Sequence, residues 1–323
     1  IFFFASSSSF QVIKNIFFSH KILLLLYCYQ FEIIKILDLL FFCLETLKFL
    51  KKQFPYFIDD IIVEMTNFNN IKALLIDLEG VLYSDNKLIP GSVETIKKFR
   101  ELGLKLRFLT NTTTAPRKFI LEKILNFGFD IDELEIFTPI IATKNYLRDN
   151  GVKKISLFTS IEIIEEFNDY EITQKNPEAV IMGDIYKNFN WEILDQIFKL
   201  VYLDNSALIA LHQNKYCMRD DKISLDLGPF VKAVEYASNK KSILMGKPEK
   251  KFFELAVKDV EESNKDILMV GDDISSDIEG SINASLKAIQ VKTGKFQKKD
   301  LDNVIQPHHR IESIADLPKL LGM

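Results

Sequence analysis

Three short apolar stretches of this 323-residue chain each lead into a side chain that carries oxygen. They are residues 73–76 before Asp77, residues 104–109 before Thr110, and residues 267–270 before Gly271, Asp272 and Asp273. An aspartate carboxylate is ionised at neutral pH and can attack phosphorus directly. Attack on a phosphate dianion also needs a neutralising cation, so these residue types indicate the chemistry of a magnesium-bound phosphate.

Aspartates supply the predicted metal ligands. Mg2+ prefers near-octahedral oxygen ligation, with one or two carboxylates and the phosphate of the substrate. Asp77 and Asp272 are the candidate pair. Asp273 and Asp277 follow closely and can orient ligands or water beside the metal.

A hydroxyl and an ammonium are the candidates for phosphate binding. Thr110, with the backbone amides that follow it, can hold phosphoryl oxygens. Lys247 lies between Gly246 and Pro248, where the proline discourages helix, and can place a cation on the same oxygens. Each motif alone also occurs in ordinary turns and helix caps. Their joint occurrence in this order favours the functional interpretation.

The elements that must position these groups form an α/β pattern. Short apolar runs that alternate with helical patterns predict parallel strands in a doubly wound sheet, where ligands bind beyond the carboxyl ends of the strands. We predict strands at residues 72–77, 104–109, 266–270 and 287–291, and helices at 91–102, 115–127, 137–150, 250–260 and 277–285.

A second, smaller α/β unit is predicted between Thr110 and Lys247. Its expected strands are residues 154–158, 179–182 and 208–211, and its expected helices are 161–167, 191–202 and 229–237. The core domain is therefore split: residues 65–148 form its first part, residues 149–241 form the inserted unit, and residues 242–323 form its second part.

Composition excludes several classes of function. The net charge is −4 and no basic run occurs, so we expect no nucleic-acid partner. The three cysteines show no pairing pattern, which fits a reducing cytoplasm better than a secreted disulfide scaffold. His308 and His309 follow a proline in a polar tail, where we expect solvated surface and not a zinc site.

Residues 1–64 differ from the rest of the chain, because they are rich in Phe, Ile and Leu and contain no glycine. Their longest uncharged apolar run, residues 22–31, is shorter than the roughly 20 residues that cross a bilayer, so we expect no membrane span. Our first hypothesis is that Met65 is the natural start and that residues 1–64 are not native. A membrane-associated helical extension and a soluble helical extension are the alternatives.

The motifs together resemble those of the haloacid dehalogenase superfamily. The matching residues are Asp77 to Tyr83, Thr110 to Thr113, Gly246 to Pro248, and Gly271 to Asp277. The insertion resembles the type IIA cap of the phosphatases in this superfamily. The resemblance extends from about residue 70 to the C-terminus and implies a Rossmann-like core with an inserted cap.

The resemblance also implies roles for individual residues. Asp77 would be the nucleophile that forms an aspartyl-phosphate, and water would then hydrolyse this intermediate. Mg2+ would be held by Asp77, the backbone carbonyl of Glu79 and Asp272, beside the other two aspartates. Thr110 and Lys247 would bind the phosphate, with Asn111 next to them.

Glu79 departs from the family pattern. Most members carry an aspartate there, which protonates the leaving group and later activates water. A glutamate carboxyl reaches one methylene further, and misplacement by about 1 Å can cost on the order of 10²-fold in rate. Glu79 is therefore a working acid/base, a slowed one, or only a neighbour of the site.

The inserted cap is expected to select the substrate. We expect the loops at residues 212–216 and 226–229 to lie over the active site, with Lys215, Tyr216 and Asp226 as candidate substrate-binding residues. His212 and Tyr216 have an equally good interpretation as cap surface. A homodimer formed through the cap is a further hypothesis.

The function expected from these observations is a cytoplasmic, magnesium-dependent phosphatase that acts on a small phosphorylated molecule. One alternative is a phosphotransferase or mutase that uses the same aspartyl-phosphate. The other, motivated by Glu79, is a weakly active phosphate-binding interaction protein. The products of the reaction and its dependence on magnesium discriminate among the three.

Overall fold

The computed structural model describes residues 68, 70–84, 86–219 and 222–323, and residues 68–323 form a compact unit. Residues 1–64 lie outside the described residues, so the three hypotheses about them stay predictions. Within the described ranges, no helix is both long enough and apolar enough to cross a membrane.

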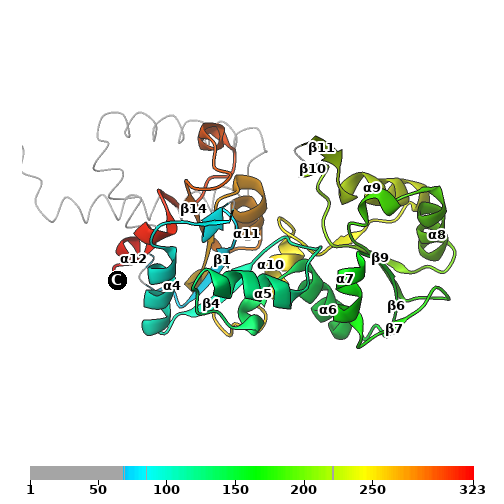
Figure 1. Ribbon diagram of the computed structural model, residues 1–323, viewed down its shortest axis with the longest axis horizontal. Helices are drawn as coiled ribbons and strands as arrows, with labels where there is room; N and C mark the ends of the chain where they lie inside the picture. Colours follow the sequence, from blue (N-terminus) through cyan, green and yellow to red (C-terminus); the bar gives the residue numbers. More distant parts are fainter. Residues whose placement is uncertain (1–67, 69, 85, 220–221) are drawn as a thin grey trace, which may run out of the picture. The chain divides into compact units, whose positions relative to one another are not determined.

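A six-stranded parallel sheet forms the core, in the order β15-β14-β13-β1-β4-β5 (Figure 1). The strands are β1 (Ala73–Asp77), β4 (Lys105–Leu109), β5 (Ile136–Phe137), β13 (Ile267–Gly271), β14 (Lys287–Val291) and β15 (His309–Ile311). The three strands that lead into Asp77, Thr110 and Asp272 are neighbours in this sheet, in the order β13-β1-β4. Their carboxyl ends therefore meet at one edge of the sheet.

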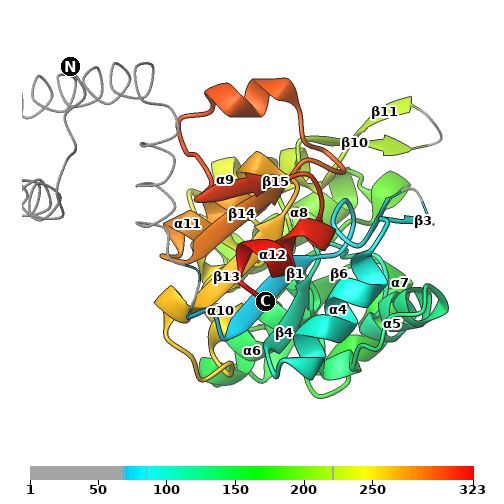
Figure 2. The same ribbon diagram turned by 90° about the vertical axis from the view of Figure 1, so that its left-hand side faces the viewer.

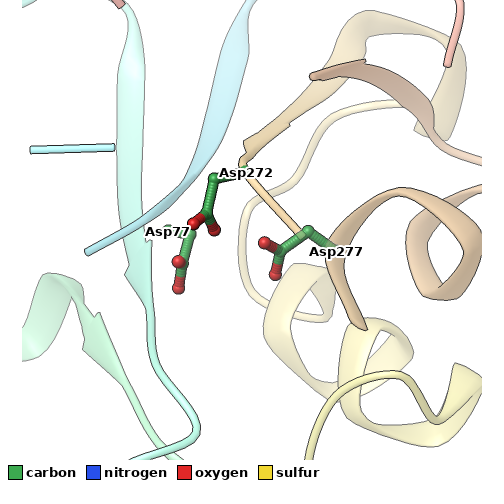
Figure 3. A group of neighbouring side chains, drawn as sticks. All are labelled: Asp77, Asp272 and Asp277. Atoms are coloured by element: carbon green, nitrogen blue, oxygen red, sulfur yellow. The ribbon is translucent and has the colours of Figure 1, made fainter. Parts of the chain in front are cut away.

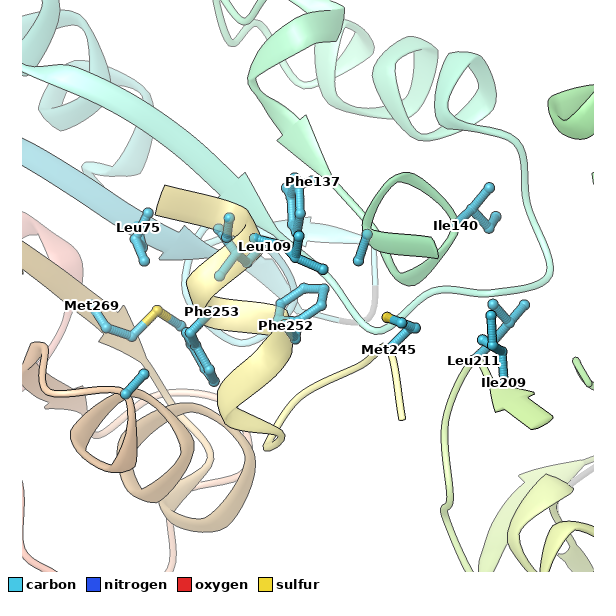
Figure 4. Close-up of a cluster of buried hydrophobic side chains, with 14 of the residues drawn as sticks. Leu75, Leu109, Phe137, Ile140, Ile209, Leu211, Met245, Phe252, Phe253 and Met269 are labelled. Atoms are coloured by element: carbon cyan, nitrogen blue, oxygen red, sulfur yellow. The ribbon is translucent and has the colours of Figure 1, made fainter. Parts of the chain in front are cut away.

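Both faces of this sheet are buried under helices. In β1, Ala73 and Leu75 belong to one hydrophobic cluster, whereas Leu74 and Ile76 belong to another on the opposite face. This alternation follows from the two-residue period of a strand. Figure 4 shows the first cluster. Its helices are α6 (Pro139–Asp149), α10 (Lys250–Val257) and α11 (Gly280–Asn283).

The helices of the opposite face are α4 (Ser92–Glu101), α5 (Arg117–Asn126) and α12 (Leu317–Leu320). Figure 2 shows α4 and α12 next to each other on this face. Helices on both faces make the sheet doubly wound, as predicted.

A second parallel sheet of five strands has the order β12-β9-β8-β6-β7. Its strands are β6 (Lys154–Phe158), β7 (Glu171–Ile172), β8 (Ala179–Met182), β9 (Ala207–Ala210) and β12 (Ile243–Leu244). Its helices are α7 (Ile161–Ile164), α8 (Trp191–Tyr202) and α9 (Leu227–Ser238). The predicted domain boundary at residues 241/242 thus falls just before β12, which still pairs within this sheet.

Short elements complete the described part. Two antiparallel hairpins are β2 (Tyr83–Ser84) with β3 (Lys87–Leu88), and β10 (Tyr216–Arg219) with β11 (Lys222–Leu225). The 3-10 turns are η1 (Glu133–Glu135), η2 (Glu165–Phe167), η3 (Tyr186–Asn188), η4 (Asn264–Asp266), η6 (Lys298–Asp302) and η7 (Ile314–Asp316). A π-helical segment, η5 (Ile274–Glu279), precedes α11.

Some expectations about elements were correct only in part. Residues 136–137 form β5, and the following helix begins at Pro139 because the Thr138 side chain caps it by accepting from the Ile141 N–H (3.2 Å). The region 277–285 is part π-helix and part α-helix. His309 lies in β15 and is half-buried, so the histidine pair is not part of a solvated tail.

Candidate active site

Three aspartates converge at the carboxyl edge of the core sheet (Figure 3). Asp77 is the last residue of β1, Asp272 directly follows β13, and Asp277 lies in η5. One oxygen of each lies within 4.8 Å of the others, and all three side chains are buried. We refer to Asp77, Asp272 and Asp277 as the carboxylate cluster.

Lys247 is buried against this cluster. Its Nζ lies 2.5 Å from Asp77 Oδ1 and 2.6 Å from Asp277 Oδ1, and 4% of its side chain is exposed. Asn111 fixes the lysine backbone from both sides: its Oδ1 accepts from the Lys247 N–H (2.8 Å), and its Nδ2 donates to the Lys247 carbonyl (2.9 Å). Asn111 therefore holds Lys247 in place at the site.

The cluster carries more negative charge than Lys247 offsets. If all three carboxylates were ionised, they and the Lys247 ammonium would sum to a net charge of −2. Burial raises the pKa of Asp77 to about 8 and that of Asp272 to about 6, because neighbouring carboxylates add to the cost of charge. Burial lowers the pKa of Lys247, but Asp277 and Asp77 outweigh it and raise that pKa. The unbalanced charge favours a bound cation.

The donor atoms fit a hard divalent cation. Asp272 Oδ1 is buried and has no hydrogen-bond partner, whereas Asp272 Oδ2 accepts from the Lys295 N–H at 2.6 Å. Buried polar atoms without a partner are uncommon and need an explanation. Carboxylate oxygens are the ligands that Mg2+ prefers. The carboxylate cluster can thus hold a metal ion.

Glycines allow the backbone to approach Asp272. A Cβ built on Gly80 would lie 2.0 Å from Asp272 Oδ2, and one built on Gly294 would lie 2.1 Å from the same atom. Both residues also have positive φ, +95° and +60°. Any side chain at either position would displace the candidate ligand.

Asp273 lies outside the cluster. Its Oδ1 caps η5 by accepting from the N–H groups of Ser275 (3.0 Å) and Ser276 (3.1 Å). Its Oδ2 lies 3.4 Å from Lys295 Nζ. The structure thus assigns Asp273 to a helix cap, and its part in metal binding stays a prediction.

Glu79 lies two residues after Asp77, in the turn that ends β1, and its side chain is exposed. The turn is closed by Gly80, whose N–H donates to the Tyr83 carbonyl at 2.7 Å. An exposed side chain in this turn can contact a leaving group. The acid/base role of Glu79 stays a prediction. Metal binding through its backbone carbonyl also stays a prediction.

Thr110 follows β4 directly and is buried. Its Oγ1 accepts from the Thr112 N–H at 3.1 Å and lies 2.9 Å from Thr112 Oγ1. The hydroxyl thus lies at the same sheet edge as Asp77, since Leu109 pairs with Asp77 across β4 and β1. Its phosphate contact is a prediction that this placement supports.

The predicted substrate residues of the inserted unit lie in two environments. Lys215 and Tyr216 are exposed, at the start of the β10–β11 hairpin. Asp226 is buried and caps α9, where its Oδ1 accepts from the Leu227 N–H at 2.8 Å. The same oxygen lies 3.8 Å from Arg219 Nη2. Their contacts with substrate stay predictions.

A polar group surrounds Asp226, and two of its members, Asp184 and Arg219, were missed from the sequence. His212 also belongs to it and is buried, so its interpretation as cap surface was wrong. His212 Nε2 lies 3.6 Å from Asp226 Oδ1, and Arg219 also pairs with Asp184. Asp184 follows β8 and His212 follows β9 by two residues each, the placement that identified the core site. The same signal could therefore have found Asp184 as well.

Comparison with known proteins agrees with this geometry. Residues 74–173 match a family model described as haloacid dehalogenase-like hydrolase, and residues 244–317 match one described as HAD-hydrolase-like. Haloacid dehalogenase-like hydrolase domain-containing protein 2 of Mus musculus is 36% identical over 73% of this chain and 90% of its own length. The chain belongs to the haloacid dehalogenase-like hydrolase family. The family resemblance inferred from the motifs is thereby confirmed.

Other members of this family show the same relationship. Phospholysine phosphohistidine inorganic pyrophosphate phosphatase of Xenopus laevis is 34% identical over 72% of this chain and 87% of that protein. The solved p-nitrophenyl phosphatase from Archaeoglobus fulgidus superposes with a TM-score of 0.71 and 25% identity, covering 77% of this chain and 99% of that chain. NagD from Escherichia coli superposes with a TM-score of 0.69. The predicted fold, a doubly wound core with an inserted cap, is confirmed.

Proposed function

We propose that this hydrolase is a magnesium-dependent phosphatase that acts on a small phosphorylated molecule through an aspartyl-phosphate intermediate. The observation that carries the proposal is the carboxylate cluster with Lys247 between two of its members, at the carboxyl edge of β1 and β13. The similarity to phospholysine phosphohistidine inorganic pyrophosphate phosphatase and to p-nitrophenyl phosphatase supports it.

In the first step, an Asp77 oxygen attacks phosphorus and the bond from phosphorus to the leaving oxygen breaks. The leaving oxygen keeps the electron pair and takes a proton from Glu79 or from water. In the second step, water attacks the phosphorus of the aspartyl-phosphate and gives a proton to Glu79 or to bulk water, while the bond from phosphorus to the Asp77 oxygen breaks and frees inorganic phosphate and the Asp77 carboxylate. A bound Mg2+ would supply charge neutralisation, held by Asp77 and Asp272 with the Glu79 carbonyl.

The remaining residues bind and orient the phosphoryl group. Lys247 stays charged because two carboxylates raise its pKa, so its ammonium can also donate a hydrogen bond to a phosphoryl oxygen. Thr110 and the backbone amides after it can donate to the other oxygens. Asn111 is a positioning residue, because its side chain holds the Lys247 backbone.

Hydrolysis of p-nitrophenyl phosphate by the full chain, with magnesium and with excess chelator, tests the proposal. We expect release of inorganic phosphate that requires magnesium. Transfer of phosphate to an organic acceptor without release would instead indicate the phosphotransferase or mutase. Binding of phosphate without turnover would indicate the interaction protein. A cytoplasmic location and a homodimer formed through the cap stay predictions.

A further inference from the structure

The loop after β14 packs directly against the candidate metal ligand. The Lys295 N–H donates to Asp272 Oδ2 at 2.6 Å, and Thr293 Oγ1 donates to the Gly80 carbonyl at 2.5 Å. A Cβ on Gly294 would lie 2.5 Å from the Cα of Gly80. The backbone of this loop is therefore held beside both Asp272 and the turn after β1.

The side chain of Lys295 is held much more loosely than its backbone. Its Nζ lies 3.4 Å from Asp273 Oδ2, and 71% of the side chain is exposed. An ion pair exposed to solvent contributes little to stability, so an incoming anion can replace this contact. Lys247 differs, because it is buried and bound by two carboxylates within 2.6 Å.

The charges at the site leave the Lys295 ammonium available to pair with an anionic group of the substrate. Lys247 offsets one of the three charges of the carboxylate cluster, and a divalent cation would offset the other two. Lys295 therefore presents an exposed ammonium from the loop whose backbone contacts Asp272, the candidate metal ligand.

We propose that Lys295 forms a subsite for a second anionic group, a carboxylate or a second phosphoryl group, on the substrate whose phosphoryl group binds at Asp77. The proposal rests on the proposed function. It deepens that function, because it assigns phosphorylated acids and pyrophosphate-like compounds as the preferred class over phosphorylated alcohols without a second charge. The ammonium would pair with the second anion by a charge-assisted hydrogen bond.

A pair of phosphonates that differ in one charge tests this subsite. Phosphonoacetate carries a carboxylate where phosphonoacetamide carries a neutral amide of nearly the same shape. Calorimetry on the full chain with saturating magnesium should show about tenfold tighter binding of phosphonoacetate. We expect Lys295→Met to reduce this ratio to about one and Lys295→Arg to restore most of it.

Lys298→Met is the matched control, because Lys298 is an exposed lysine three residues further along the chain, and the ratio should not change. The magnesium requirement of Lys295→Met should also be unchanged, since the contact with Asp272 comes from the backbone N–H. A ratio near one in the unmodified protein, or an unchanged ratio in Lys295→Met, would overturn the subsite. Because binding needs no turnover, that failure is distinct from an absence of phosphatase activity. Absence of binding by both phosphonates would overturn the phosphate site itself.

Discussion

Asp272 and Asp273 are neighbours in the chain but have different surroundings. Asp272 is buried in the carboxylate cluster with one unpartnered oxygen, whereas Asp273 caps η5 through two backbone N–H groups. The two side chains therefore separate metal binding from local stability. The sequence analysis predicted Asp272 as a ligand and Asp273 as a residue that orients ligands or water beside it, because adjacent aspartates after a strand offer no signal that one of them is a helix cap.

Substitution of each aspartate tests this separation. We expect Asp272→Ala to raise the magnesium concentration for half-maximal activity at least tenfold and to leave the protein folded. Asp273→Ala should lower the free energy of unfolding by about 1 kcal/mol through loss of the cap, with a much smaller effect on the magnesium requirement. Magnesium titrations and denaturant unfolding measure the two effects. Equal magnesium requirements in both variants would contradict the separation.

Glu79 is exposed in the turn after Asp77, as a general acid near a leaving group has to be. If it donates the proton in the transition state, Glu79→Ala should lower kcat about 10²-fold for an alkyl phosphate. The effect should be small for p-nitrophenyl phosphate, whose leaving group needs little protonation. Glu122→Ala, at an exposed glutamate of α5, is the control. Equal losses on both substrates, or none on either, would remove Glu79 from proton transfer.

At the scale of elements, the site is assembled where β13, β1 and the loop after β14 meet. Gly294 tests this contact, because its φ is +60° and a Cβ would lie 2.1 Å from Asp272 Oδ2. Gly151 has a similar φ of +67° but no atom within 4 Å of a built Cβ. We expect both Gly→Ala variants to lose about 1–2 kcal/mol of stability from the left-handed backbone.

Only Gly294→Ala should also lose most of its activity and raise its magnesium requirement, because only there would the new methyl group displace Asp272. Thermal unfolding and magnesium-dependent hydrolysis of p-nitrophenyl phosphate distinguish the two effects. Similar activity in Gly294→Ala and Gly151→Ala would show that this loop does not position the candidate ligand.

The strands that carry Asp77, Thr110 and Asp272 could be predicted, because each is a short apolar run that ends in a polar residue. The contact between Lys295 and Asp272 could not, because it depends on β14 lying next to β13 in the sheet. The β10–β11 hairpin was also missed, since Tyr216–Arg219 shows no alternation of apolar and polar side chains and Lys222–Leu225 alternates over only four residues. Contacts between loops that are distant in the chain can be predicted only when the order of strands in the sheet is known, and local sequence patterns do not give that order.

At the scale of the whole molecule, residues 68–323 form a compact unit with its own buried clusters on both faces of the core sheet. A protein that starts at Met65 should therefore fold and keep the activity of the full chain within about twofold. Circular dichroism, thermal unfolding and hydrolysis of p-nitrophenyl phosphate are the measurements. Loss of folding or of activity on truncation would show that residues 1–64 belong to the functional protein.

The central proposal is a covalent bond between Asp77 and the phosphoryl group of the substrate. Quenching the enzyme during turnover and reducing it with borohydride converts an aspartyl-phosphate into homoserine, which peptide mass spectrometry locates. We expect homoserine at position 77 in the unmodified protein and none in Asp77→Asn, which should retain the fold and have no measurable turnover. Homoserine at another position, or turnover retained by Asp77→Asn, would contradict the assignment of Asp77 as nucleophile.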